Sequence, residues 1–272
     1  MMFPGLSDVV GFCRLAVRAV LPIDCMSCDR PLRRDPTPYF CDACWDGITP
    51  LSGPRCACCD QPFASPAASI STPGHRCQSC LQRPPAYDRA WTLYPYSPPL
   101  QDAICALKYR SVFGLVNPLA ALTIRALPEE LAPDVIVPVP LHSSRLRTRG
   151  FNQSLLIADR LGRHLRRPVS ATDLVRTIAT EPQTSLTRAK RMRNLRLAFA
   201  VRRNAAFSGR RVLLIDDVFT TGTTLNECAK VLRSAGAASV SALTLARTID
   251  SSLIPDRILA AHAARSTISR RN

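Results

Sequence analysis

Acidic and hydroxyl-bearing residues follow an apolar stretch in the C-terminal half of the chain. Residues 212–225 read VLLIDDVFTTGTTL, in which two carboxylates precede a threonine-rich turn with one glycine. Where such a turn opens a helix, unpaired N–H groups and a positive dipole face an anion, and glycine lets the backbone approach it closely. The turn therefore predicts a phosphate site, and the carboxylates predict hydroxyl groups or a Mg²⁺-bound ligand. The candidate residues are Asp216, Asp217, Thr220, Thr221, Gly222, Thr223 and Thr224.

Other phosphate-binding motifs fit this stretch less well. A Walker A loop requires GxxxxGK[ST], and no such lysine follows the turn, while the dinucleotide fingerprint GxGxxG is absent. A capped helix after a strand, with two carboxylates at the edge of the sheet, is the purely structural alternative. A pentose phosphate with free 2- and 3-hydroxyls offers both an anion for the turn and hydroxyls for the carboxylates, so we favour it as the ligand.

Cysteines form the second group of residues that could do chemistry. Ten of the 12 cysteines lie within residues 13–80, and eight of them form four CxxC pairs. Two residues between thiolates let one turn present both sulfurs to one ion, and two such turns complete a tetrahedral Cys₄ site. We expect two structural zinc ions, and the spacing leaves open which pairs share an ion. The expected ligands are Cys25, Cys28, Cys41, Cys44, Cys56, Cys59, Cys77 and Cys80.

A redox role for the CxxC pairs is less favoured, because none of the four turns sits between a strand and a helix. Full thiolate ligation would leave no open coordination position, so we expect these zinc ions not to catalyse. Cys58 is the expected spare thiol beside Cys59, and Cys13, Cys105 and Cys228 lie in apolar surroundings typical of core cysteines.

The elements that position the phosphate turn are those of an α/β domain. Apolar runs and helical periodicity alternate along this part of the chain, and Gly236 stands where a helix C-cap glycine belongs. Strand, helix and strand at this spacing predict a βαβ unit in a parallel sheet. We expect strands over residues 134–139, 211–216 and 239–245, and helices over 152–166 and 223–235.

Four segments are expected along the chain. Residues 1–23 have the apolar spacing of an amphipathic helix, and residues 24–85, rich in Cys, Pro and Ser, suit a small metal-bound module. The α/β domain would occupy residues 86–250, and residues 251–272 would form a C-terminal tail.

The sequence shows neither a secretion signal nor a membrane span. Arg14 and Arg18 interrupt the apolar residues 9–21, whereas a secretory signal has an uninterrupted apolar run. No apolar run approaches the ~18–20 residues needed to cross a bilayer. We therefore expect a cytoplasmic protein, in which clustered thiols stay reduced and bind metal rather than forming disulfides.

Positive charge is concentrated in one segment. Residues 145–211 carry 17 basic and three acidic side chains, whereas residues 1–144 carry 12 of each. Such clustering favours a polyanionic partner, either a phosphate compound or nucleic acid, and a solvated basic face is the alternative. The aromatic side chains available in the segment for base stacking are few. They are Phe151, Phe199 and Phe207, and the arginines that we expect to contact DNA are Arg188, Arg191 and Arg193.

With these motifs in view, the chain resembles a known family. The string DDVFTTGTT resembles the phosphoribosyl pyrophosphate motif of type I phosphoribosyltransferases. Together with residues 134–154 (DVIVPVPLHSSRLRTRGFNQS) and the four CxxC pairs, it makes the chain similar to the competence protein F (ComF) family over about residues 20–247. The resemblance implies a type I phosphoribosyltransferase-like parallel sheet flanked by helices and preceded by a small Cys-rich double zinc-ribbon module.

The resemblance also assigns roles to residues. It implies that Asp216 and Asp217 contact the ribose hydroxyls and that Thr220–Thr224 cradle the 5-phosphate. The turn at Val139–Arg145 would be the pyrophosphate loop, with guanidinium groups as its phosphate partners. Lys108 and Tyr109 are a further candidate pair for the site. The residues of the pyrophosphate loop and the helix after it are Val139, Pro140, Arg145, Arg149, Asn152 and Gln153.

Three functions remain open at this point. The first is a protein that binds phosphoribosyl pyrophosphate with Mg²⁺ and serves DNA uptake and natural transformation, with single-stranded DNA and a DNA-uptake helicase or ATPase as partners. The second is an active phosphoribosyltransferase, for which the sequence shows no hood that would read a nucleobase acceptor. The third is a sensor that binds phosphoribosyl pyrophosphate without turnover.

Overall fold

A four-stranded parallel sheet forms the centre of the computed structural model, which describes residues 23–32, 35–63, 74–177, 198–202 and 205–249. The strand order is β3-β8-β7-β4, and every neighbouring pair is parallel. The predicted βαβ unit is confirmed as β7, α9 and β8, and Gly236 ends α9 with a φ of +87°. The expected helix over 1–23 and the tail over 251–272 lie almost wholly outside the described residues.

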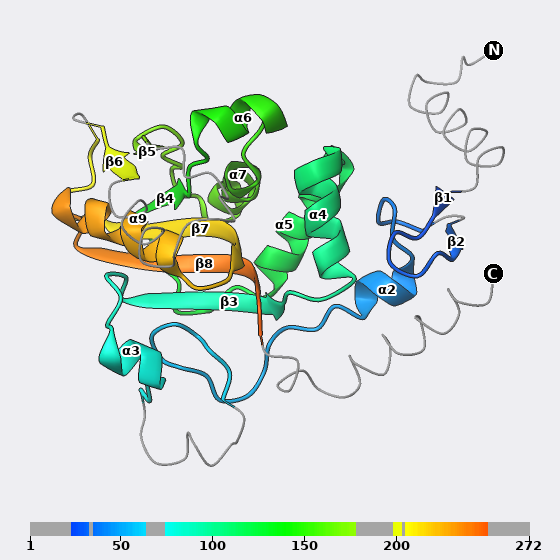
Figure 1. Cartoon of the computed structure of the whole chain (residues 1–272), viewed down its shortest axis with the longest axis horizontal. Coiled ribbons are helices and arrows are strands. Elements are labelled where there is room, and N and C mark those ends of the chain that lie inside the picture. Colours follow the sequence, from blue (N-terminus) through cyan, green and yellow to red (C-terminus); the bar gives the residue numbers. More distant parts are fainter. Residues whose placement is uncertain (1–22, 33–34, 64–73, 178–197, 203–204, 250–272) are drawn as a thin grey trace, which may run out of the picture.

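The helices and strands occur in the following order (Figure 1). They are β1 (Ile23–Asp24), β2 (Pro31–Leu32), α2 (Asp42–Asp46), α3 (Gln78–Gln82), β3 (Arg89–Pro95), α4 (Leu100–Arg110), η2 (Phe113–Leu115), α5 (Val116–Arg125), β4 (Val135–Pro138), α6 (Ser143–Arg149), α7 (Gln153–Leu165), β5 (Leu174–Arg176), β6 (Phe199–Val201), β7 (Arg211–Phe219), α9 (Thr223–Ser234) and β8 (Ser239–Arg247).

The sheet is buried on both faces, as its continuous apolar strands require. Alternate strand residues such as Leu213 and Ile215 pack under α4, α5 and α7, while Val212 and Leu214 pack under α9. The Cys-rich module contributes to both faces. Cys25 and Cys44 pack with the core residues under α4, α5 and α7, and Cys56 packs with those under α9. The module therefore straddles the sheet, with α2 near one end of β3 and α3 near the other (Figure 1).

The segment between the two halves of the module covers the outer edge of β3. The Leu51 amide donates to the Leu93 carbonyl at 2.8 Å, and the Ala90 amide donates to the Cys58 carbonyl at 2.8 Å. Between these two hydrogen bonds, a carboxylate accepts the β3 amide that would otherwise pair with a neighbouring strand. Asp60, only 3% exposed, accepts from both the amide (2.7 Å) and the hydroxyl (3.1 Å) of Thr92. An open edge strand invites pairing with other chains, and this cover prevents it.

In the part of the chain that the structure describes, no helix combines the length and apolar composition needed to cross a bilayer.

We predict that Asp60→Ala destabilises the fold by about 3–5 kcal/mol, the usual cost of removing one partner of a buried ion pair. The change would leave the Thr92 amide without its acceptor and Arg55 without the carboxylate that lies 2.9 Å from its Nη1. Urea unfolding of the zinc-loaded protein measures the loss. The control is Glu130→Ala, because the Arg89–Glu130 pair is exposed on both sides and should contribute at most ~1 kcal/mol. Equal losses in the two variants would contradict the role of Asp60.

Candidate functional site

The turn predicted to bind phosphate, which begins at Thr220 and which we call the phosphate turn, connects β7 to α9 at the carboxyl edge of the sheet. Gly222 caps the 12-residue helix α9 with a φ of +72°, a conformation that other residues rarely adopt. A Cβ at this position would come within 2.5 Å of the Phe219 ring, so the close packing of the turn also requires glycine. The Thr221 and Thr223 hydroxyl oxygens lie 2.9 Å apart and are exposed. The turn can therefore present hydroxyl and N–H donors to an anion.

The two carboxylates lie within β7 rather than at its end. We expected the strand to stop at residue 216, but its pairing with β8 continues to Phe219 opposite Arg247. This extension leaves Asp217 only 5% exposed and Asp216 half-buried. The apolar residues after the acids, Val218 and Phe219, explain the longer strand, because both can pack while pairing continues.

Each carboxylate has a partner from a helix far away in the sequence. Lys108, at the end of α4, places its Nζ 2.6 Å from Asp217 Oδ2. The Ser154 hydroxyl, at the start of α7, donates to Asp216 Oδ1 at 3.0 Å. Burial, together with the charge of Asp217, raises the pKa of Asp216 to about 7, although Lys108 opposes the shift. Asp216 can therefore gain or lose a proton near neutral pH.

The segment after β4 folds differently from the expected turn. We predicted a turn over Val139–Arg145, but Ser143–Arg149 forms α6, so the turn ends at His142. The His142 ring accepts from the Ser144 amide at 3.2 Å, and Gly150 ends the helix with a φ of +78°. This capping, rather than an apolar face, defines α6, since none of its residues is buried.

Two of the expected pyrophosphate-loop residues hold the backbone together. Asn152 caps α7 by accepting from the Ser154 amide at 3.0 Å, and its Nδ2 donates to the Val139 carbonyl at 3.0 Å. Gln153, 5% exposed, accepts from Arg149 Nη1 at 2.7 Å. These contacts fix the start of α7, and with it Ser154, against the end of β4. Pro140 lies in the same turn, half-buried.

Arg176 lies within electrostatic range of both Asp216 and Arg145. Burial lowers the pKa of Arg176, on β5, and the charge of the nearby Arg145 adds to this effect, while Asp216 opposes it. Two arginines within electrostatic range of each other are a candidate place for a polyanion to bind. Arg145 is exposed on α6 and is therefore accessible to a ligand.

The eight predicted cysteines gather into two groups of four, Cys25-Cys28-Cys41-Cys44 and Cys56-Cys59-Cys77-Cys80. Within each group the sulfurs lie within 4.8 Å of one another. Two sulfur pairs lie 3.7 and 3.6 Å apart, close to the ~3.8 Å expected between thiolates that bind one zinc at ~2.3 Å. Backbone amides of Cys41 and Cys77 also donate to sulfurs of their own groups. Both groups fit a tetrahedral zinc ion, and consecutive CxxC pairs come together.

The other cysteines behave differently. Cys58 is buried beside the second group but does not belong to it, and Cys228 is fully buried in the core, as expected. Cys105 is half-buried, with its sulfur 3.5 Å from the Tyr96 hydroxyl. Cys13 lies outside the described residues.

A buried arginine joins the second cysteine group to the phosphate turn. Arg247, 5% exposed at the end of β8, donates from Nη1 to the Cys59 carbonyl at 2.6 Å and from Nε to Gln61 Oε1 at 3.1 Å. Its Cζ lies 4.3 Å from the centre of the Phe219 ring, the ring that packs against Gly222. The position of the turn therefore depends on the zinc-ribbon half of the molecule.

The structure does not test the predicted DNA-contacting residues. Arg188, Arg191 and Arg193 lie outside the described residues. The three phenylalanines that we named as the few stacking candidates of the segment pack into the core. Phe151, Phe199 and Phe207 are 8%, 5% and 1% exposed.

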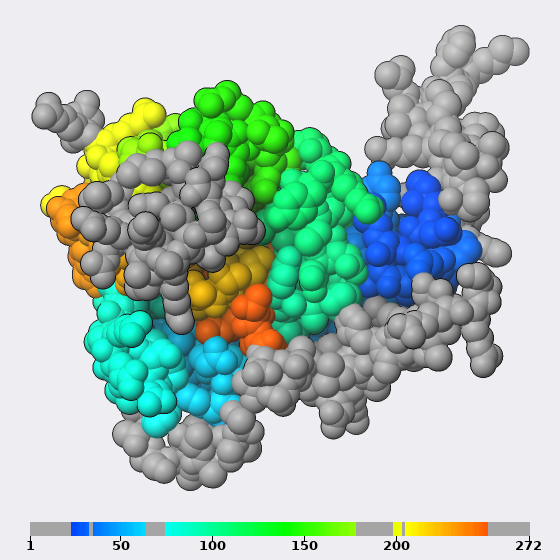
Figure 2. All heavy atoms as spheres, in the orientation of Figure 1, coloured from blue at the N-terminus to red at the C-terminus, as the bar shows by residue number. Residues whose placement is uncertain are grey.

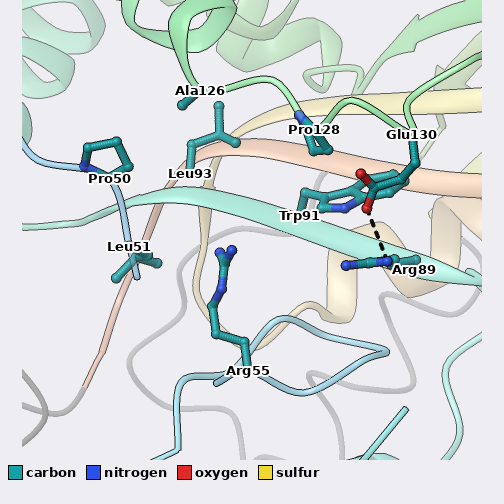
Figure 3. A pocket seen from close by; sticks show the side chains of 9 residues that line it. All are labelled: Pro50, Leu51, Arg55, Arg89, Trp91, Leu93, Ala126, Pro128 and Glu130. Carbon is teal, nitrogen blue, oxygen red and sulfur yellow. Dashed lines mark ion pairs between the residues drawn. The ribbon is translucent and has the colours of Figure 1, made fainter. Parts of the chain in front are cut away.

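A cavity of about 220 Å³ lies away from these groups, beside the outer edge of β3 (Figure 3). Both of its arginines already have carboxylate partners, Arg55 in Asp60 and Arg89 in Glu130. The carboxylates of β7 and the phosphate turn do not line it.

Comparisons with known proteins agree with this two-part organisation. The family described as phosphoribosyl transferase domain matches residues 152–258, and the family described as double zinc ribbon domain matches residues 16–81. The DNA utilization protein YhgH of Escherichia coli K12 is 38% identical over 179 residues, which cover 64% of this chain and 78% of that protein.

Two further similarities extend the comparison. Competence protein F of Haemophilus influenzae is 34% identical over 216 residues, which cover 76% of this chain and 90% of that protein. Among solved structures, the chain is similar to a purine phosphoribosyltransferase from Pyrococcus horikoshii, with 18% identity, a TM-score of 0.31, and coverage of 52% of this chain and 85% of that one.

We predict that Cys59→Ser lowers the zinc content of the purified, reduced protein from about two ions per chain towards one, because a Cys₄ site loses a ligand. Elemental analysis measures the change. Cys58→Ser is the matched control, since the neighbouring thiol lies outside both groups and should leave the zinc content unchanged. Absence of zinc from the wild-type protein, or equal losses in the two variants, would contradict this assignment.

Proposed function

Because the chain belongs to the competence protein F (ComF) family, we propose that it binds phosphoribosyl pyrophosphate with Mg²⁺ and serves DNA uptake by binding single-stranded DNA. The observation that carries the proposal is the placement of two partnered carboxylates beside a Gly-hinged turn at the start of α9. One side of this arrangement suits hydroxyls, and the other suits a phosphate. The proposal places the chain in the cytosol, where thiols stay reduced.

In this proposal the residues of the turn hold the 5-phosphate. The N–H groups at the start of α9 and the hydroxyls of Thr220–Thr224 donate to its oxygens. Asp216 and Asp217 accept hydrogen bonds from the 2- and 3-hydroxyls of the ribose. Mg²⁺ would enter with the pyrophosphate and neutralise part of its charge, and the carboxylates are suitable oxygen ligands for it. Lys108 holds Asp217 in place through the 2.6 Å ion pair.

The pyrophosphate would lie towards α6 and β5. Arg176 is within electrostatic range of Arg145, and a pyrophosphate would offset the repulsion between the two guanidinium groups. Arg149 donates to Gln153, so in this proposal it supports the start of α7, and Arg145 is the main arginine contact of the pyrophosphate.

Zinc has a structural role in this proposal. The eight cysteines would bind two zinc ions, and full thiolate ligation leaves each ion without an open position for a substrate. The second ion would hold Cys59, whose carbonyl binds Arg247. Loss of that ion should therefore loosen the phosphate turn as well as the module.

The DNA function is supported by charge. Residues 145–211 carry a net charge of +14, and the three arginines of α6 within this segment include no buried side chain. Two relatives carry the names DNA utilization protein and competence protein F. A single strand delivered by an uptake helicase or ATPase would meet this basic segment first, because charge steers association.

We predict that Asp216→Asn combined with Asp217→Asn weakens binding of Mg²⁺–phosphoribosyl pyrophosphate at least about a hundredfold, since each hydrogen bond to a charged group contributes ~1.5–3 kcal/mol. Isothermal titration calorimetry measures the affinity. Glu130→Gln, at an exposed carboxylate beside Arg89, is the control and should bind like the wild type. Equal affinity in the wild type and the double variant would move the site elsewhere.

Pyrophosphate release in the same samples, with bases or DNA present, would show a transferase rather than a sensor.

The same binding should depend on pH. With a pKa of about 7, Asp216 must lose a proton before it can accept from a hydroxyl as a carboxylate. Affinity should therefore rise as the pH increases towards about 7 and level off above it. Asp216→Asn should abolish this component while leaving the titration of the ligand's own phosphates, which serves as the internal reference.

We predict that single-stranded DNA binds with a steep dependence on salt, which Arg188→Gln, Arg191→Gln and Arg193→Gln together flatten by about two units. Each phosphate contact contributes ~0.7 log units of affinity per tenfold salt. Fluorescence anisotropy at several salt concentrations gives the slope. Replacing the exposed Arg30, Arg83 and Arg89 with Gln is the control for total charge. An unaltered slope in the first variant would show that this segment is only a solvated face or serves the small ligand.

A further inference from the structure

Exposed aromatic side chains gather beside α6. Four large apolar side chains stand out as exposed in the described part of the chain, and three of them lie on α4, η2 and α6. Tyr109 is 75% exposed, Phe113 54% and Leu146 42%. Figure 2 shows the surface of α4 and α5 adjoining the green surface that contains α6. Neighbouring exposed aromatic side chains are typical of surfaces that bind a partner.

Contacts link these rings to the basic helix. The Arg149 Cζ lies 5.6 Å from the centre of the Tyr109 ring. Phe113 packs edge-on against Phe151, with ring centres 4.8 Å apart, and Phe151 follows Arg149 by two residues. Both rings are thus linked to α6 or to the residues just after it, and we call Tyr109, Phe113, Leu146 and Arg149 together the aromatic patch.

The aromatic patch carries uncompensated positive charge. Helix α6 reads SSRLRTR, with arginines at 145, 147 and 149 and no acidic residue. Arg110 follows Tyr109 directly and is also exposed. None of these four arginines forms an ion pair within the described ranges of the chain. Their charge therefore selects a polyanion as the partner.

The patch adjoins the proposed phosphoribosyl pyrophosphate site without being part of it. Lys108 pairs with Asp217, while the next residue, Tyr109, turns its ring to solvent. On the other side, Arg149 binds Gln153, and the next residue, Ser154, donates to Asp216. A single strand of DNA lying over the patch would thus pass beside Asp216 and Asp217, the carboxylates proposed to bind the ribose.

We propose that the rings of Tyr109 and Phe113 stack on bases of single-stranded DNA whose phosphates are held by the exposed Arg110 and Arg147. Stacking platforms interleaved with a basic surface are how proteins bind single strands irrespective of sequence, and duplex DNA keeps its base faces covered. The inference rests on the proposed DNA-binding function. It assigns the base contacts to Tyr109 and Phe113, which lie outside the basic segment 145–211, and leaves the phosphate contacts to arginines. If this surface instead bound a protein, loss of the two rings would not weaken binding to dT15 more than binding to a strand without bases.

The test measures binding of the zinc-loaded full chain to fluorescein-labelled dT15 and to a 15-mer of abasic deoxyribose phosphates, which has the same charge. Tyr109→Leu with Phe113→Leu keeps apolar side chains but removes the ring faces. We expect this variant to bind dT15 at least about tenfold more weakly than the wild type. It should bind the abasic strand with unchanged affinity, and its salt slope on dT15 should match that of the wild type. Leu81→Ala, at an exposed side chain on α3, is the control and should change neither.

The outcomes separate this inference from the proposed function. If the wild type binds neither strand, the DNA-binding function and this inference both fail, and calorimetry with phosphoribosyl pyrophosphate still reports on the small-ligand site. If the wild type binds dT15 but the Leu variant loses nothing, or loses equally on both strands, the base-stacking inference alone is overturned. Unchanged zinc content and circular dichroism in the Leu variant establish that it is folded.

Discussion

The buried guanidinium of Arg247 makes the contacts that join the Cys-rich module to the α/β domain. A buried cation is tolerated only where its surroundings supply compensating negative charge and hydrogen-bond acceptors. The Cys59 carbonyl and Gln61 supply the acceptors, and a zinc-bound Cys₄ group, with a charge of about −2, would supply the field. Because Arg247 also stacks on Phe219, the residues proposed to bind metal and those proposed to bind phosphate share one support.

The two cysteine groups have similar local structures but different surroundings. In each, an aspartate with positive φ follows the second cysteine, Asp29 in one and Asp60 in the other. The amide of each aspartate donates at 2.9 Å to the carbonyl of the first cysteine of its group. Only Asp60 is buried, since it turns its carboxylate to the edge of β3. The second of the two similar cysteine turns thus also satisfies the edge of β3, which the first turn does not do.

Local patterns were enough to predict the core of the fold. The apolar run of β7, the glycine at 222 and the periodicity of α7 are each encoded within a few residues, so their positions could be read directly from the chain. Helix α6 was missed because it has no buried face and is defined by its caps. Lys108, Ser154 and Arg247 acquire their roles from partners far away in sequence, 188 residues in the case of Arg247 and Cys59, and no local pattern records such pairs.

The cover on β3 also bears on how the protein is made. During synthesis β3 emerges before its sheet partner β8, which follows roughly 140 residues later, and at ~5–20 residues per second this delay is on the order of ten seconds. A bare apolar strand is prone to aggregate over such a time. The segment with Leu51 and Asp60 precedes β3 and can cover one edge while the ribosome completes the rest. The Cys-rich module would then shield one edge of β3 until β8 has been synthesised.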